Sequence, residues 1–535
     1  MPRWIYDFGE GDSSKIELLG GKGANLAAMT DIGLPVPAGF TITTEAWRAF
    51  RDTGSLPEGL SDEVDRHLSR LAGVMGRSFG DPNDPLLVSV RSGSPRSMPG
   101  MMDTVLNVGL TDATVKRLAA QTGDHAFAWD CYRRLIEMFS DTVKNIPRST
   151  LDEVAGAPRH RGHLKRSEEK RRVRRLQEAI AEATGEPFPQ DPSEQLRLSI
   201  EAVFRSWDGD RARHYRRMNA IPDDLGTAVT IQAMVFGNRG EGSGTGVVFT
   251  RNPLTGARSP FGDFLPDAQG EDVVAGICDP LPLLEMSQRH PSAWQDLRRH
   301  MSVLESHFRD MCDIEFTVER ETLWLLQCRV GKRSALAEWV IAAAMAEEGL
   351  IDEATAVRDR ITPSRLDELL RPSIRADVKK SRPALTVGVG ASPGAAVGRV
   401  VLYPEYACGR DDELILVRSE TAPEDYLGMV ASRGILTSTG GANSHAAVVA
   451  RAEGKPAVCG ASEICISPDR FTFAVGETVV RQWDWITIDG NDGSVYLGRL
   501  DTEPSVLEAA VRGDEAARSS AIWRAYRRFV GPATA

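Results

Sequence analysis

The chain has 535 residues, which at roughly 100–200 residues per domain corresponds to several domains, each large enough to bury its own core. Hydrophobic residues make up 41% and charged residues 26% of the sequence, so extensive disorder is excluded. A formal net charge of -11 argues against a protein whose main role is to coat nucleic acid or an anionic membrane.

The cysteines and the N-terminus bear on the cellular compartment. Seven cysteines are scattered without a C-x-x-C pair, which predicts reduced thiols and no structural zinc site. The N-terminal sequence MPRWIYDFGEGD has no basic segment followed by an apolar one, and no apolar run approaches the about 20 residues of a membrane span. We therefore expect a cytoplasmic protein without membrane or nucleic-acid partners.

The first and largest region, residues 1–335, alternates strand-like and helix-like segments, as mixed α/β domains do. One basic block, residues 159–175, could bind an anion or nucleic acid. A solvated helix face is favoured, because acidic residues are interspersed and aromatic residues are absent. The strands are expected at 86–90, 229–235, 245–249, 314–318 and 323–330.

Three further segments follow. Residues 336–384 are helix-like, highly charged and interrupted by Pro363, Pro372 and Pro383, which is typical of a linker and could contain a movable joint. Residues 385–500 predict a second compact domain, and residues 501–535 a helical tail. The second domain's strands are expected at 397–402, 414–417, 434–436, 485–488 and 494–497.

Two glycine-rich segments of the first region can bind an anion. The segment LLGGKGANLAAM places Lys22 between a glycine turn and a helix, although it is not a Walker A loop and glycines alone would fit a structural turn. The segment LLVSVRSGSPRSMPGMMDT leads from an apolar strand into a flexible loop carrying Arg91 and Arg96, whose guanidinium groups suit phosphate oxygens. Surface ion pairs are the alternative for the arginines, but together the segments predict a polyphosphate site.

The segment DIEFTVERETLWLLQCR predicts a β-hairpin. If residues 320–322 form its turn, Glu315 lies opposite Gln327 and Asp313 lies opposite Arg329. Carboxylates and an amide oxygen beside an arginine can hold Mg²⁺ against phosphates, with Glu315 and Gln327 as the metal ligands. Cross-strand ion pairing on a solvated hairpin is the alternative interpretation.

The segment TSTGGANSHAAVVARAEGKPAVCG contains the clearest candidate nucleophile, His445. Asn443 and Ser444 are good N-caps, so a short helix should begin at His445 and end at Gly454, before Pro456. A helix N-terminus favours a neutral, nucleophilic imidazole and can stabilise a phosphoryl group attached to it. A capping or surface histidine is the alternative, but the small residues around it leave room for a phosphate.

These segments, together with SGTGVVFTRNP and DAQGEDVVAG, resemble the pyruvate, phosphate dikinase family and its relatives, phosphoenolpyruvate synthase and the rifampicin phosphotransferases, over residues 1–500. The resemblance implies an α+β multidomain protein: an ATP-grasp domain at 1–335, a helical linker at 336–384, a swivelling β/β/α phosphohistidine domain at 385–500 and a helical tail at 501–535. It implies the phosphorylated histidine at His445. The implied ATP-binding residues are Lys22, Arg91, Arg134, Gln232, Met234, Val235, Asp313, Glu315, Gln327 and Arg329.

Two departures from the family pattern affect function. Asn443 stands where the family usually has threonine, so regulation by phosphorylation there is not expected. Residues 501–535 are too few for the family's C-terminal TIM barrel of about 250 residues, which binds pyruvate or phosphoenolpyruvate. The acceptor is therefore expected on a separate barrel-bearing chain.

The expected activity is a dikinase reaction in which Mg²⁺ and ATP phosphorylate or pyrophosphorylate the protein's own histidine and AMP is released. Pyruvate or another acceptor then receives the phosphoryl group, inorganic phosphate is a further expected partner, and a homodimer is compatible with this scheme. One alternative is a phosphotransferase for another small molecule, similar to the rifampicin enzymes. Another is a non-catalytic partner of a full-length dikinase, which the intact candidate site argues against.

Overall fold

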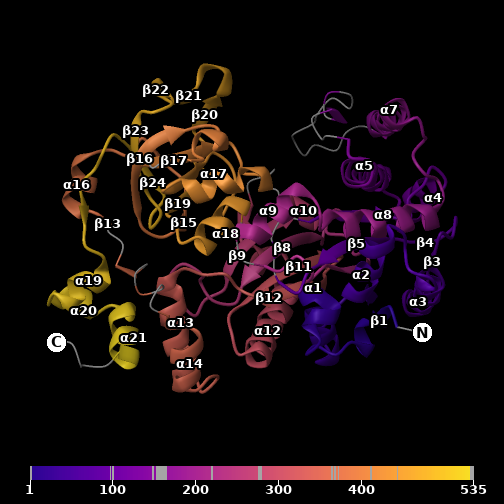
Figure 1. Ribbon diagram of the computed structural model, residues 1–535, viewed down its shortest axis with the longest axis horizontal. Coiled ribbons are helices and arrows are strands. Elements are labelled where there is room, and N and C mark those ends of the chain that lie inside the picture. Colours follow the sequence, from indigo (N-terminus) through magenta and orange to yellow (C-terminus); the bar gives the residue numbers. More distant parts are fainter. Residues whose placement is uncertain are drawn as a thin grey trace. The chain divides into compact units, whose positions relative to one another are not determined.

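The protein is a mixed α/β, multidomain chain that divides into two compact units in the computed structural model (Figure 1). The first unit comprises Met1–Glu241 and Thr322–Arg329, and the second comprises Gly242–Glu321 and Val330–Ala535. The predicted nucleotide-binding region 1–335 thus contributes to both units. The structure describes residues 3–96, 98, 102–146, 150–151, 153, 166–218, 221–274, 280–362, 366, 369–370, 373–409, 413–442 and 444–530.

The first unit contains an antiparallel five-stranded sheet whose central strand, β7, buries all six of its residues. Helices α1 (Ile16–Asp31) and α8 (Pro192–Ser206) both pack against β5 and β7 and so position the segments at the strand ends. The strand order is β1 (Ile5–Asp7), β2 (Gly39–Ile42), β7 (Ala228–Ala233), β5 (Val88–Gly93) and β6 (Thr104–Val108).

A helical layer accompanies this sheet. Helix α5 (His125–Thr142) packs against β6 and against α4 (Thr114–Thr122) and α7 (Arg166–Thr184). The seven residues 159–165 of the basic block lie outside the described part of the chain, and α7 carries the remainder. The other elements of this unit are α2 (Thr44–Thr53), α3 (Leu60–Met75), α9 (Asp210–Met218), β3 (Ser78–Phe79), β4 (Pro85–Leu86) and most of β12 (Thr322–Val330).

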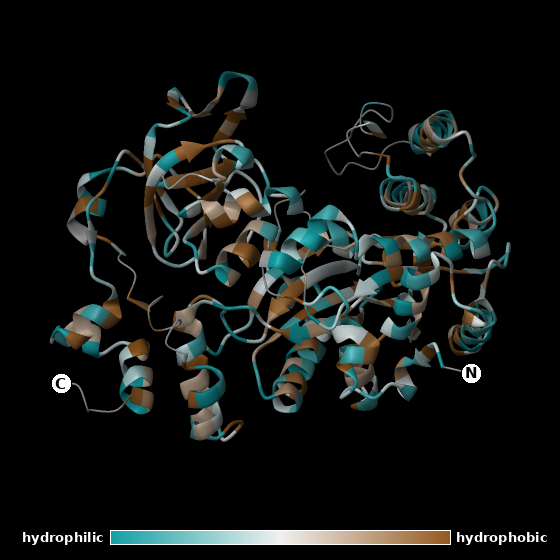
Figure 2. Ribbon diagram, viewed as in Figure 1, coloured by the Kyte–Doolittle hydropathy of each residue, from teal (hydrophilic) through white to brown (hydrophobic). Residues whose placement is uncertain are grey.

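The second unit begins with antiparallel strands in the order β10 (Leu281–Pro282), β9 (Phe261–Pro266), β8 (Gly244–Phe249) and β11 (Cys312–Glu319). Helix α12 (Pro291–Phe308) contacts β11, and its buried residues recur every three or four positions. Figure 2 shows both hydrophilic and hydrophobic residues along α12, as expected for a helix with one buried face. Two short helices, α10 (Gly270–Val274) and α11 (Glu285–Arg289), complete this part.

An eight-stranded sheet forms the later part of the second unit. Four of its strands, β16 to β19, run parallel, and helices α17 (Tyr426–Ala431) and α18 (His445–Ala452) connect β17 to β18 and β18 to β19. The strand order is β14 (Thr386–Val387), β24 (Ser494–Leu497), β23 (Trp485–Asp489), β16 (Ala395–Val401), β17 (Leu414–Arg418), β18 (Gly434–Thr437), β19 (Ala457–Cys459) and β15 (Val389–Ser392).

A three-stranded sheet of β20 (Ile464–Ser467), β21 (Thr472–Val475) and β22 (Thr478–Arg481) shares a hydrophobic core with the eight-stranded sheet. Val400, Ile415, Phe473 and Ile486 are among its fully buried members. The strands predicted in this region from alternation and turn residues are confirmed, with boundaries that shift by no more than two residues.

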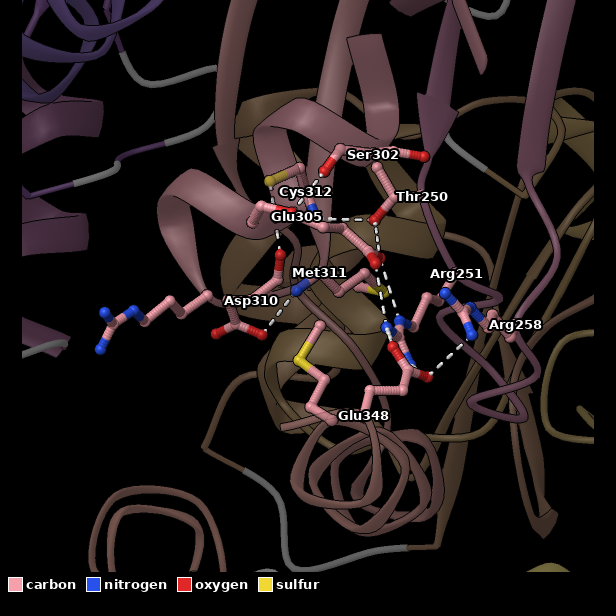
Figure 3. Close-up of polar contacts among 12 residues, drawn as sticks. Thr250, Arg251, Arg258, Ser302, Glu305, Asp310, Met311, Cys312 and Glu348 are labelled. Carbon is pink, nitrogen blue, oxygen red and sulfur yellow. Dashed lines mark hydrogen bonds and ion pairs between the residues drawn. The ribbon is translucent and has the colours of Figure 1, made fainter. Parts of the chain in front are cut away.

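Buried ion pairs attach the first part of the predicted linker to the strands of the second unit (Figure 3). The Arg251 guanidinium, 0% exposed, donates to Glu305 on α12 at 2.9–3.0 Å and to Glu348 at 2.7–3.1 Å. Glu348 is the C-cap of α13 (Ala335–Glu347), so this network joins α12, α13 and the end of β8. Removing one partner would leave a buried charge, which makes the attachment strong.

A second cluster extends this attachment to α14 (Glu353–Asp359). Arg333 donates to Asp310 at 2.6 Å, and Arg360 donates to the same carboxylate oxygen at 3.0 Å. The predicted joint region 336–384 is therefore tied down by ion pairs as far as Arg360. Pro363 and Pro372 lie outside the described residues.

The end of the linker is bound to the eight-stranded sheet instead. Strand β13 (Ser373–Ile374) pairs with β25 (Thr502–Glu503), and Lys379 on α16 (Ala376–Ser381) forms ion pairs with Asp489 and Asp492. The tail forms three helices, α19 (Val506–Val511), α20 (Glu515–Arg518) and α21 (Ala521–Val530), of which α21 packs against α13.

Two sequence expectations concern features of the whole chain. Throughout the described residues, no helix combines the length and apolar character that a membrane span needs. The six cysteines that lie in the described part of the chain are free thiols.

Candidate functional site

The first glycine segment forms a turn that sets Lys22 against the end of β5. Helix α1 is kinked at Gly20, which has φ 67°, and a Cβ there would lie 1.7 Å from the carbonyl oxygen of Gly93. The Gly21 N–H donates to the Ser94 carbonyl at 2.9 Å. Only glycine fits so close an approach at positive φ, so the turn requires Gly20 and opens the helix that carries Lys22.

The structure brings the two predicted anion-binding segments together. A Cβ on Gly93 would lie 3.4 Å from Cβ of Lys22, and Gly93 is two residues from Arg91 on β5. Lys22 and Arg91 therefore belong to one cationic site in the first unit. Arg96, the second arginine of the loop, is exposed.

Strand β12 adds the next two candidates to the same unit. Its backbone accepts from Arg91 at Leu326 (3.3 Å) and from the Asn25 side chain at Cys328 (2.9 Å). Gln327, 8% exposed, and the half-buried Arg329 are thereby held beside α1 and β5. The β12 backbone on either side of Gln327 therefore contacts Arg91 and α1, which places Gln327 and Arg329 in the same unit as Lys22 and Arg91.

Arg134 lies on α5 and is oriented by Asp130. Its Nε donates to Asp130 at 2.8 Å, and Asn238 donates to the same carboxylate oxygen at 3.3 Å. Burial alone would raise the pKa of Asp130, but Arg134 and Arg133 outweigh it and hold the pKa at about 2. Asp130 therefore stays ionised and fixes the direction of Arg134.

Gln232, Met234 and Val235, three of the implied ATP-binding residues, lie at the end of β7 or directly after it. The Gln232 side chain is 2% exposed and donates to the Pro37 carbonyl at 3.1 Å, while the Met234 N–H donates to the Leu87 carbonyl at 2.9 Å. Met234 and Val235 are half-buried and follow the strand. The Gln232 side chain thus bonds to the segment that precedes β2, and the Met234 backbone bonds to the segment that precedes β5.

The acidic candidates lie on β11 in the second unit. Asp313 is 4% exposed and Glu315 is half-buried, and they pair with Phe249 and Val247 of β8. The turn after β11 differs from the prediction. It has two residues, Arg320 and Glu321, with φ 47° and 65°, and Thr322 already belongs to β12, so the assumed three-residue turn is wrong.

These acidic residues suit a metal that arrives with a nucleotide. Carboxylate and amide oxygens are hard ligands, and Mg²⁺ usually takes one or two carboxylates plus substrate phosphates. Among the described residues no group of three His, Cys, Asp or Glu side chains could form an all-protein cage. Glu315 and Gln327 stay the predicted Mg²⁺ ligands, and Asp313 lies two residues from Glu315 on the same strand.

His445 lies at the carboxyl edge of the parallel strands, where ligands bind in open α/β sheets. Helix α18 begins at His445, and the Ser444 hydroxyl caps it by accepting from the Ala447 N–H at 3.4 Å, as predicted. His445 Nδ1 lies 3.1 Å from Oγ1 of Thr421, which follows β17 at the same edge. Its Nε2 is buried and, among the described residues, has no hydrogen-bond partner.

Burial also sets the charge of this imidazole. It lowers the pKa of His445 to about 4, although the nearby Glu424 carboxylate opposes the effect. At neutral pH the ring is therefore neutral. If Nδ1 carries the proton and donates it to Thr421, the Nε2 lone pair is available as a nucleophile at a helix N-terminus.

Two residues near His445 were missed by the sequence reasoning. Thr421 is 24 positions away and meets His445 only because β17 and β18 are parallel neighbours. Asp263 of β9 lies opposite Val247, and a Cβ on Gly441 would come within 3.1 Å of its carboxylate. Thr421 could have been identified only from the strand order of the eight-stranded sheet, and Asp263, which lies on a strand of another sheet, only from the tertiary packing.

Comparison with known proteins identifies two matching family models and several similar sequences. Residues 16–66 and 54–292 match the family model "Pyruvate phosphate dikinase, AMP/ATP-binding domain", and residues 410–493 match "PEP-utilising enzyme, mobile domain". The chain is 45% identical over 524 residues to the pyruvate, phosphate dikinase of Clostridium symbiosum and 46% identical over 540 residues to that of Rhizobium meliloti. Each alignment covers 96% of this chain but only 59% of the relative.

A plant relative is likewise similar to nearly the whole of this chain and longer than it. Chloroplastic pyruvate, phosphate dikinase 1 of Arabidopsis thaliana is 46% identical over 517 residues, which cover 94% of this chain and 54% of the relative. The chain therefore spans between about half and three fifths of the length of these curated relatives. The two family models cover Lys22, Arg91, Arg134 and the segment 232–235 in the first match and His445 in the second.

Proposed function

Because the chain belongs to the pyruvate phosphate dikinase family, we propose that it uses ATP to phosphorylate its own His445 for transfer to an acceptor. In this proposal residues 1–335 form an ATP-grasp domain, and residues 385–500 form a swivelling phosphohistidine domain. The activity is that of a phosphotransferase of the dikinase type. Pyruvate is the proposed acceptor, as the names of the relatives suggest.

The state of His445 carries the proposal. The imidazole is neutral at physiological pH, its Nδ1 is held by Thr421 at 3.1 Å, and its Nε2 has no competing hydrogen bond among the described residues. A histidine that served only as a helix cap would not need a buried, unpartnered Nε2, which costs free energy. A phosphoryl acceptor needs that nitrogen unprotonated and accessible to phosphorus.

The proposed step is a displacement at the β-phosphorus of ATP. The Nε2 lone pair of His445 forms the N–P bond, and the bond between the β-phosphorus and the α,β-bridging oxygen breaks. AMP leaves with that electron pair, so a pyrophosphoryl group remains on Nε2 while Thr421 accepts the hydrogen bond from Nδ1–H. The γ-phosphoryl group then passes to inorganic phosphate, which leaves a phosphohistidine.

The cationic site of the first unit supports the nucleotide end of this reaction. Lys22, Arg91 and Arg329 offer positive charge, and phosphoryl transfer is accelerated mainly by positioning and charge neutralisation. Arg134, held by Asp130, is the fourth proposed cation, and Met234 and Val235 are proposed to contact adenine. Mg²⁺, when bound with ATP, would neutralise phosphate charge beside Asp313, Glu315 and Gln327.

Labelled ATP tests the proposal directly. The protein is incubated with ATP labelled separately at the β and γ positions, with Mg²⁺ and with or without inorganic phosphate. We expect acid-labile, base-stable β label on the wild-type chain and AMP in solution, with the γ label on the chain when phosphate is absent and in pyrophosphate when phosphate is present. His445→Asn should abolish the label, whereas His307→Asn, a change at an exposed histidine of α12, should not.

Retention of label by His445→Asn, or no AMP from the wild-type chain, would refute the proposal. Adding pyruvate tests the acceptor separately. Phosphoenolpyruvate formed with the chain alone, or only after addition of a barrel-bearing dikinase whose own histidine is replaced, identifies pyruvate and shows which chain binds it. Failure in both mixtures would remove pyruvate as the acceptor without affecting the first step.

A further inference from the structure

We propose that Arg451 is a positioning residue that holds the loop preceding His445 in its reactive arrangement. This inference rests on the proposed function of His445. Arg451 lies in the last turn of α18 and is 0% exposed. Its Nη1 donates to the Ala442 carbonyl at 2.7 Å and to the Ala391 carbonyl at 2.9 Å.

These two bonds connect parts of the domain that are distant in sequence. Ala391 belongs to β15, at the edge of the eight-stranded sheet, and Ala442 lies three residues before His445. Side chains on a helix point toward its N-terminus, so Arg451 reaches back along α18 to the loop at its start. One guanidinium nitrogen thereby ties the histidine loop to the sheet.

The loop needs such an external constraint because of its composition. Residues 438–442 are Ser, Thr, Gly, Gly and Ala, and Gly440 has φ 94°. Glycine-rich backbone has little intrinsic stiffness. The loop's own backbone bonds include Ser444 N–H to Gly441 (3.1 Å) and Gly460 N–H to Thr439 (3.3 Å), which is long. The start of the loop is held separately, because the Thr439 N–H donates to the Ser419 carbonyl at 2.9 Å, so the Arg451 bond to Ala442 at 2.7 Å constrains the end of the loop that is nearer His445.

Burying a guanidinium group costs more desolvation free energy than burying an apolar side chain of the same size. Charged groups pay a large desolvation penalty on burial, and an apolar side chain of similar volume often packs as well or better. Arg451 also lies with its guanidinium carbon 5.6 Å from the centre of the Phe249 ring, a cation–π contact within the second unit. The bonds to Ala391 and Ala442 give the charge a role that an apolar residue could not take.

The expected consequence is kinetic. A shift of the loop moves the Ser444 cap and with it Nε2 of His445, and a misplacement of about 1 Å can cost about 100-fold in rate. Nucleotide affinity should change little, because the proposed phosphate-binding cations Lys22, Arg91 and Arg329 belong to the first unit, whereas Arg451 belongs to the second. Loss of Arg451 should therefore separate the rate of phosphorylation from the binding of ATP.

The test uses single-turnover phosphorylation of the full chain by ATP. Arg451→Met should slow the labelling of His445 about 100-fold while the Kd for ATP stays within twofold of the wild type. Arg451→Lys should be less impaired, because one ammonium nitrogen can donate to both carbonyls. In Arg451→Ala, millimolar guanidinium should restore part of the rate, and the same concentration of tetramethylammonium should not.

Two control variants separate positioning from stability. Ile486→Ala opens a cavity in the core of the same domain and should lower the unfolding temperature with little effect on the labelling rate at low temperature. Arg433→Met removes an exposed arginine that pairs with Glu413 at 2.6 Å. This variant should change neither the unfolding temperature nor the labelling rate. A purely structural role of Arg451 would make its variants behave like Ile486→Ala.

Each outcome is informative. Wild-type labelling rates in Arg451→Lys and Arg451→Met, or an equal loss that guanidinium does not restore, would overturn the inference. If Arg451→Met does not fold, the rate of Arg451→Lys and the rescue of Arg451→Ala by guanidinium test the inference. Absence of label on the wild-type chain would instead refute the proposed function, so the two failures are distinguishable.

Discussion

The environment of His445 predicts a specific dependence of stability on pH. Burial lowers the pKa of His445 to about 4 in the folded protein, whereas an exposed histidine in the unfolded chain has a pKa near 6.5. Above pH 6.5 the ring is neutral in both states and contributes no pH dependence. Between pH 6.5 and pH 4 only the unfolded chain binds the proton, so acidification favours unfolding.

The size of this effect follows from the two pKa values. Each pKa unit corresponds to about 1.4 kcal/mol, so at pH 5, which is 1.5 units below the unfolded pKa, the folded state loses about 2 kcal/mol relative to pH 8. Below pH 4 the folded protein also binds the proton, and the loss reaches its limit of about 3–4 kcal/mol, which corresponds to the difference of about 2.5 pKa units. His445→Gln, which cannot titrate, should lose this share of the pH dependence.

The assay compares the unphosphorylated wild-type chain with His445→Gln by urea unfolding at pH 8 and pH 5. Between pH 8 and pH 5 the free energy of unfolding should fall by about 2 kcal/mol more in the wild type than in His445→Gln. The other titrating groups are the same in both proteins and cancel in this comparison. An NMR titration of the His445 ring should give a midpoint near 4. Equal slopes, or a ring that titrates near 6.5, would refute the neutral, desolvated nucleophile.

Three further predictions concern the site and its support. Thr421→Val should slow phosphorylation of His445 about tenfold, the equivalent of one hydrogen bond, and Thr421→Ser should restore it; an unchanged rate in the valine variant would show that Nδ1 needs no partner. Glu315→Ala should reduce AMP formation from ATP more than tenfold through lost charge neutralisation, whereas the same change at Glu319 on the same strand should not; near-normal AMP formation would return Glu315 to an ion-pair role. Arg251→Met should lower the free energy of unfolding by about 3–5 kcal/mol because two glutamates lose their buried partner, and a loss below 1 kcal/mol in urea unfolding would contradict that.

Local sequence signals were sufficient for the elements that carry the candidate site. The Ser444 cap and the start of α18 at His445 depend on a few adjacent residues, and the structure confirms both. The glycine turn before Lys22 is also local, since Gly20 alone explains the kink in α1. Alternating hydrophobic residues located β11 and β12 because each strand buries one face more than the other.

Features that depend on distant contacts could not be predicted in this way. Thr421 reaches His445 through the pairing of two parallel strands, and Arg251 finds Glu305 and Glu348 at separations of 54 and 97 residues. The hairpin turn was misjudged because positive φ at Arg320 is uncommon for a residue other than glycine, asparagine or aspartate. Its composition therefore gave no sign of a two-residue turn.

The central claim is that Nε2 of His445 receives phosphorus from ATP, and phosphorus–nitrogen coupling tests it most directly. The chain is prepared with ¹⁵N-labelled histidine, treated with ATP and Mg²⁺, and studied by ³¹P and ¹⁵N NMR under alkaline conditions that preserve phosphohistidine. We predict one phosphoramidate signal, coupled to the Nε2 nitrogen of His445 and lost in His445→Asn. A phosphoryl group on Nδ1, on another histidine, or on no histidine would contradict the account.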